Sequence, residues 1–282
     1  MSTAHAAVKR ELLVRYLDNW APAALHGARR ATYAEMSPGS DVVDALRVFA
    51  EFPELLAKHA LHVVLAGELP TAATVPAGVV VQSVDGALLP HLAPARDGPL
   101  FIHLDLPGSD PPEPAELAEL ATGRATELLM VLDAGPGRGL LQAAGFACAV
   151  EVELVDEAGT GQQLLFGTGS AKHLAGFKEA LWAVDEYAGV RYRDPLDDEH
   201  TLLDISLSPH VGPLKRALLA RVRRGASTVA ELRDYTVAET IYQAADANRV
   251  LTALLGNGAL ARSPERGRLT AETVIAPGRA AA

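Results

Sequence analysis

Hydrophobic positions follow two alternating patterns over the first two thirds of the chain. Continuous apolar runs, such as 100–104 (LFIHL) and 127–132 (ELLMVL), are typical of strands covered on both faces of a parallel sheet. Between these runs, apolar residues recur every three or four positions, which predicts amphipathic helices. The expected strands are 31–35, 61–66, 79–81, 100–104, 127–132, 149–155 and 162–167, and the expected helices are 8–20, 41–49, 53–60, 114–122, 137–145 and 171–184.

Five strands that alternate with helices, followed by a terminal hairpin, predict a doubly wound α/β sheet with mostly parallel strands. The turn residues 156–161 between the last two strands indicate the hairpin. Seven strands with a closing hairpin are also the layout of the class I methyltransferase fold, a Rossmann-type sheet. Because doubly wound sheets have many functions, this likeness by itself assigns none.

The last third of the chain has a separate pattern. Residues 185–199 are polar and irregular, and we interpret them as the connection between two domains, 1–200 and 201–282. Helices are predicted over 213–223, 227–234 and 239–255, with Ser227 as an N-cap. The runs 259–262 and 268–274 flank a turn and predict a hairpin. Three helices and a two-stranded wing predict a winged helix-turn-helix.

The two parts differ in charge. Residues 213–282 contain eleven Lys and Arg against six Asp and Glu, whereas the rest of the chain contains fourteen against twenty-nine. The acidic part should not bind nucleic acid non-specifically, but the basic tail is able to. A single cysteine, Cys148, excludes an internal disulfide framework and a multi-cysteine metal site. With no apolar run near membrane-spanning length, we expect a cytoplasmic protein without membrane contact.

Four segments resemble the three-Cys-motif partner (TcmP) family. They are 9–13 (KRELL) with Tyr16 and Leu17; 37–40 (SPGS) with Ala45 and Leu46; 101–108 (FIHLDLPG); and 176–182 (GFKEALW). The last segment is the most specific, and together the segments extend from residue 9 to residue 182. The resemblance implies a methyltransferase-like domain followed by a winged-helix tail.

Two segments depart from the family pattern. Family members have a glycine-rich loop between the first strand and the Ser-Pro-Gly-Ser, whereas here Glu35 and Met36 lead directly into Ser37. The family's Asp-Pro-Phe-Gly is replaced by residues 105–108 (DLPG). The shortened loop counts against ordinary cofactor binding, and loss of the Asp-Pro pair counts against chemistry on a base-like substrate.

Several residues lie where a methyltransferase holds S-adenosylmethionine, at the carboxyl ends of the strands. Glu35, Ser37 and Gly39 follow the first strand, where the backbone approaches the methionine part of the cofactor. Glu68 follows the second strand, where an acid binds the ribose hydroxyls, and Asp85 follows the third, where it can accept from the adenine amino group. Alternatively, these acids are solvated loop carboxylates or helix caps, and Gly39 is only a turn residue.

The candidate catalytic residues lie on the fourth strand. Asp105 ends this strand, where a methyl acceptor would meet the cofactor, and His103 lies in its middle. His103 is either a hydrogen-bonded core histidine or a general base with a tuned pKa. The nine histidines lack the close spacing typical of metal ligands, so no metal site is expected.

The basic tail has two interpretations. Arginines of helices and wings contact phosphates in nucleic-acid complexes, but the expected recognition helix, 239–255, has one arginine, Arg249, and is poorly equipped to read bases. Winged helices also dock protein partners or form homodimers.

The sequence therefore predicts an S-adenosylmethionine-dependent methyltransferase-like protein with an unidentified acceptor. One alternative is a non-catalytic relative that binds a protein or nucleic-acid partner through its winged helix. The other is a fold repurposed for different small-molecule chemistry.

Overall fold

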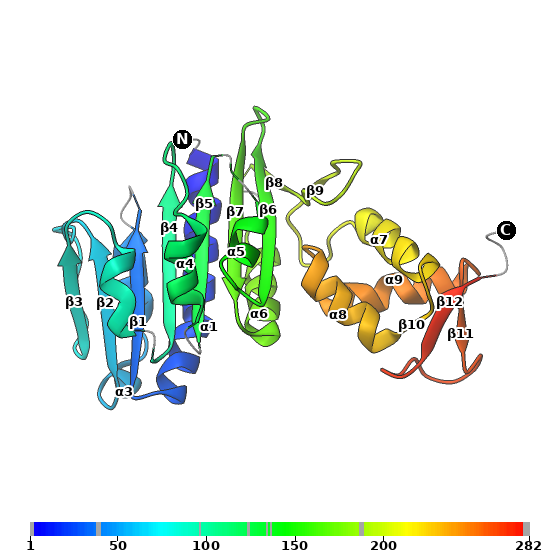
Figure 1. The fold of residues 1–282 in the computed structure, drawn as a ribbon, viewed down its shortest axis with the longest axis horizontal. Coiled ribbons are helices and arrows are strands. Elements are labelled where there is room, and N and C mark those ends of the chain that lie inside the picture. The colour runs from blue at the N-terminus through cyan, green and yellow to red at the C-terminus, as the bar shows by residue number, and fades with distance from the viewer. Residues whose placement is uncertain are drawn as a thin grey trace.

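A large mixed α/β sheet forms the body of the molecule (Figure 1). The structure, a computed structural model, describes residues 3–37, 41–95, 97–122, 125–133, 135, 137–185 and 189–278. The strands of the large sheet are β1 (Arg30–Met36), β2 (Ala60–Ala66), β3 (Val79–Val84), β4 (Leu100–Leu106), β5 (Thr126–Leu132), β6 (Cys148–Asp156), β7 (Gly161–Thr168), β8 (Val190–Arg193) and β9 (Leu202–Asp204). These bounds confirm the seven expected strands.

The order of the strands places a switch point between β1 and β4. The order is β3-β2-β1-β4-β5-β7-β6-β8-β9, in which the first five strands are mutually parallel and each later pairing is antiparallel. The chain winds outward from β1 through β2 to β3 and then returns to β4 on the other side. In open α/β sheets, ligands commonly bind outside the carboxyl ends of the strands at such a switch point.

The sheet has nine strands among the described residues, which corrects the expected seven. β8 lies within the segment expected to be irregular, and β9 lies beyond residue 200. Two alternate residues of β8, Val190 and Tyr192, are buried, while Arg191 between them is exposed. Such a short alternation carries too little periodicity to be recognised in a sequence, and pairing with β6 and β9 makes it a strand.

Helices cover both faces of the large sheet. The long α1 (Thr3–Gly27), α2 (Asp41–Phe49) and α6 (Ala171–Trp182) pack on one face around Phe101 and Phe166. The turn η1 (Leu89–Ala95), α4 (Pro114–Ala121) and α5 (Gly139–Ala143) pack on the other, and a short α3 (Pro53–Leu56) precedes β2. Tyr16 of α1 meets Phe101 edge-on at a ring separation of 5.2 Å. Because both faces are covered there, the central strands β4 and β5 are buried along their whole length.

The C-terminal segment, residues 212–278, contains three helices and a small sheet. The helices are α7 (Gly212–Arg223), α8 (Val229–Glu239) and α9 (Ala244–Gly256), and the strands β10 (Ser227–Thr228), β11 (Leu260–Ser263) and β12 (Val274–Pro277) pair antiparallel in the order β10-β12-β11. Thr228, not Ser227, caps α8, since its side chain accepts from the Glu231 amide while the Glu231 carboxylate accepts from the Thr228 amide. The expected helix 239–255 begins only at Ala244.

Helix α6 holds the turn between α8 and α9. The Lys178 ammonium group donates to the carbonyls of Val237, at 2.5 Å, and of Thr240, and the Trp182 indole donates to the carbonyl of Ile241 at 2.9 Å. These contacts explain why residues 240–243 do not continue a helix. They also give a structural role to residues 176–182, the most specific part of the TcmP resemblance. Among the described residues, no helix has the length and apolar character that a membrane span requires.

Candidate functional site

The switch point between β1 and β4 brings polar side chains together under the N-terminal half of α1. Glu35 of β1 is the register partner of His103 of β4, and Asp105 lies two residues further along β4. Asp41 is the first residue of α2, which follows the loop after β1. Parallel strands end at the same edge of a sheet, so these residues meet although β1 and β4 are far apart in the sequence.

Glu35 is a buried carboxyl group, with an exposed fraction of 1%. The Tyr33 hydroxyl donates to its Oε2 at 2.5 Å, and the Ser37 hydroxyl donates to its Oε1 at 3.1 Å. Burial raises the pKa of Glu35 to about 7, because the hydrogen bonds from Tyr33, Ser37 and the Val42 backbone only partly offset the loss of water around the charge. A carboxyl group with this pKa can hold or release a proton near neutral pH.

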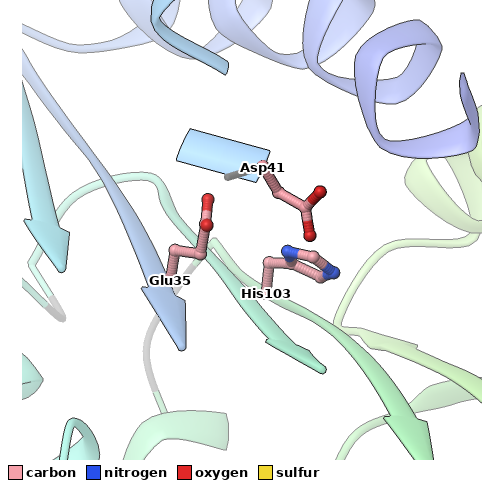
Figure 2. A group of neighbouring side chains, drawn as sticks. All are labelled: Glu35, Asp41 and His103. Atoms are coloured by element: carbon pink, nitrogen blue, oxygen red, sulfur yellow. The ribbon is translucent and has the colours of Figure 1, made fainter. Parts of the chain in front are cut away.

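Asp41 and His103 face Glu35, as Figure 2 shows. One oxygen of Glu35, one oxygen of Asp41 and one ring nitrogen of His103 all lie within 4.8 Å of one another. Burial raises the pKa of Asp41 and lowers that of His103 to about 4, so the imidazole is neutral at pH 7. His103 is 2% exposed, and its Nδ1 has no hydrogen-bond partner among the described residues.

Asp105 forms a salt bridge with a lysine of α1. The Lys9 ammonium group lies 2.7 Å from Asp105 Oδ2, and both side chains are almost fully buried. Outside this buried pair, Arg10, the next residue of α1, and Arg47 of α2 both bind Asp44 of α2. Asp105 Oδ1 has no hydrogen-bond partner in the part of the chain that the structure describes. The end of β4 is thus covered by a charged helix rather than open to solvent.

The other predicted cofactor residues lie further along the same edge. Glu68 and Asp85 are exposed and follow the paired ends of β2 and β3, where the Gly67 amide donates to the Val84 carbonyl at 2.9 Å. Ser37 is half-buried against Glu35. Gly39 lies outside the described residues. The structure therefore groups Glu35, Ser37, His103 and Asp105 at the switch point and sets Glu68 and Asp85 on the neighbouring strand ends.

Sequence reasoning missed two members of this site. The sequence pattern identified Asp41 only as the first residue of the expected helix 41–49, and Lys9 contributed only to the family resemblance. Asp41 could have been found from its place just after the first strand, since the first turn of the helix that follows lies at the carboxyl edge. No local signal pairs Lys9 with Asp105, because three strands (β1, β2 and β3), the helices α2 and α3 and the turn η1 lie between them in the chain.

A separate cavity opens at the opposite edge of the sheet, where β4 and β5 begin. It has a volume of about 470 Å³, and its lining includes Tyr16, Trp20, Glu127 and His173. The buried Glu127 carboxylate accepts from the Tyr16 hydroxyl and lies 2.9 Å from His173 Nδ1. The nearby Glu127 carboxylate raises the pKa of His173. The sequence did not predict this group, whose members come from α1, β5 and α6.

No protein-family model matches the chain, and no curated protein sequence matches it either. Its function is therefore inferred from the fold and from the site.

Proposed function

We propose that this protein is an S-adenosylmethionine-dependent methyltransferase-like protein of the TcmP type, acting on an unidentified acceptor. The observation that carries the proposal is the topology: five parallel strands, a switch point between β1 and β4, and a closing antiparallel hairpin of β6 and β7. This is the layout expected of a methyltransferase domain. In the proposal, β8 and β9 extend that sheet, and the C-terminal segment is a winged helix.

The exposed acids on the neighbouring strand ends fit the adenosine part of the cofactor. Glu68 and Asp85 lie beside each other at the ends of β2 and β3 and are free to accept hydrogen bonds from a ligand. Glu35 accepts from Ser37 and so orients the start of the loop that would meet the methionine part. The cofactor supplies the reactive methyl group when it is bound, and the protein contributes alignment of the acceptor.

Calorimetric titration with S-adenosylmethionine and S-adenosylhomocysteine tests this proposal. We expect micromolar binding, weakened at least about tenfold by Glu68→Gln or Asp85→Asn, since a hydrogen bond to a charged group contributes about 1.5–3 kcal/mol. Glu54→Gln is the matched control, because Glu54 is an exposed carboxylate of α3 outside the site. Unchanged affinity in both site variants would show that the cofactor, if bound, is held elsewhere.

A non-catalytic role is the second candidate, and the buried Lys9–Asp105 pair favours it. An acid neutralised by a lysine and covered by α1 is a poor partner for a methyl acceptor. If neither cofactor gives heat or a thermal shift at millimolar concentration, the protein works by binding a partner instead.

For that partner, three arginines in the proposed winged helix favour protein over nucleic acid. Arg249 binds Asp246 and the Pro209 carbonyl, Arg216 binds Asp197 and Glu199, and Arg262 donates to three carbonyls of its own turn. Guanidinium groups used internally in this way are not free for phosphates. We therefore propose docking of a protein, either a different chain or a second copy of this one. Fluorescence anisotropy with labelled duplex DNA at low salt should show weak binding only.

A further inference from the structure

The Glu35, Asp41 and His103 side chains form a ligand set for a metal ion. They come from the end of β1, the start of α2 and the middle of β4, and they converge on one point (Figure 2). Their ligand atoms lie within 4.8 Å of one another. Ligand atoms on opposite sides of a first-row divalent ion lie about 4 Å apart, since each bond is about 2.1 Å long. Small side-chain rotations are therefore enough to bring the three ligand atoms within bonding distance of one ion.

The unpartnered nitrogen of His103 is an independent observation that points to a ligand. Its Nδ1 is buried and has no hydrogen-bond partner among the described residues. A buried polar atom without a partner is costly, and native structures rarely keep one without an ion or a water molecule to satisfy it. The His103 ring also lies against the two carboxylates rather than among apolar side chains alone (Figure 2).

The local charge agrees with a divalent cation. Lys9 is paired with Asp105, and Arg10 and Arg47 are paired with Asp44. Glu35 and Asp41 form no salt bridge with any of the residues that the structure describes. Two adjacent, largely buried carboxylates repel each other when both are ionised, and one divalent ion neutralises both.

We propose that Glu35, Asp41 and His103 bind one first-row transition-metal ion, Zn²⁺ or Mn²⁺, at the carboxyl ends of β1 and β4. Mixed imidazole and carboxylate ligands suit these ions, whereas Mg²⁺ favours oxygen ligands and retained water. Three protein ligands leave coordination positions open, as in metal sites that also bind a substrate atom. The proposal departs from the expectation of no metal site and is independent of cofactor binding.

Metal titration of the chelator-treated protein, without any cofactor, tests the proposal. We expect one equivalent of Zn²⁺ or Mn²⁺ to bind with micromolar affinity and Mg²⁺ to bind at least about tenfold more weakly. Asp41→Asn should weaken Zn²⁺ binding at least about tenfold. Asp44→Asn should leave it within about twofold, because Asp44 is a carboxylate of the same helix that is already paired with arginines. Equal binding by the two variants, or no binding by the wild type, would overturn the proposal.

A spectroscopic measurement on the wild type keeps the test independent of how the variants fold. Pulsed electron paramagnetic resonance of the Mn²⁺-loaded protein should show coupling to a single imidazole nitrogen. In a His103→Gln variant that melts cooperatively, the coupling should be lost. A wild-type signal without nitrogen coupling would exclude His103 as a ligand and with it the proposed site.

Discussion

Burial is the main cause of the shifted pKa values of single side chains in this protein. Lys178 is fully buried, and desolvation lowers its pKa to about 7, although nearby Asp194 partly opposes the shift. Its amine nevertheless contacts the carbonyls of Val237, Thr240 and Tyr242 at the turn between α8 and α9. The same physical cause raises the pKa of Glu35 and lowers that of His103. A buried ionisable group is therefore a source of pH-dependent stability in this fold.

The lowered pKa of Lys178 fixes the direction in which the stability of the fold changes with pH. Between pH 7 and pH 10, a lysine in the unfolded chain stays protonated, whereas native Lys178 loses its proton near pH 7. The unfolded state then binds more protons, so the contribution of Lys178 to the free energy of unfolding rises with pH, by at most about 1.4 kcal/mol per unit. Urea denaturation at pH 7 and pH 9 should show a smaller rise for Lys178→Met than for the wild type. Lys172→Met, at an exposed position of α6, should behave as the wild type does.

At the scale of elements, local sequence signals place most helix and strand ends. Asp41–Phe49 is a helix with the bounds that its pattern predicts, and β2, β4 and β5 begin or end within two residues of expectation. The first helix is longer than the predicted 8–20 and extends from Thr3 to Gly27, and in the C-terminal segment α8 continues to Glu239 and α9 starts five residues later than predicted. Helix propensity over 239–243 is overridden because Lys178 and Trp182 hold the carbonyls of this turn.

The capping box of α8 gives a prediction for one element. Thr228→Ala removes the side-chain acceptor for the Glu231 amide, and we expect a loss of about 1 kcal/mol in the free energy of unfolding. Thr252→Ala, at an exposed position in the middle of α9, should change it by less than about 0.5 kcal/mol. Chemical denaturation of both variants measures the difference, and equal effects would argue against the cap.

At the scale of the whole molecule, long-range polar contacts join helices to the sheet. The Lys9–Asp105 pair ties the first helix to β4 across 96 positions of sequence. In the same way, Lys178 and Trp182 join α6 to the turn between α8 and α9. Buried pairs of this kind are costly to break on one side only, because the remaining charge is left without a partner.

The Lys9–Asp105 pair therefore predicts non-additive stability effects. Lys9→Met leaves Asp105 buried and unpaired, and we expect a loss of about 3–5 kcal/mol in the free energy of unfolding. The double variant Lys9→Met with Asp105→Leu should recover most of this loss, because two apolar side chains need no partner. A double-variant cycle by urea denaturation measures the coupling, and additive losses would contradict a direct interaction.

The sequence by itself determined the first seven strands, most of the helices and the α/β class of fold with a mostly parallel sheet, because apolar periodicity is a local property of the chain. It also placed Glu35, His103 and Asp105 at strand positions near one edge. Only the tertiary structure decided that Asp41 faces His103, that Lys9 neutralises Asp105 and that β8 and β9 join the sheet. These features depend on register and on packing between distant segments, and neighbouring residues carry no information about such contacts.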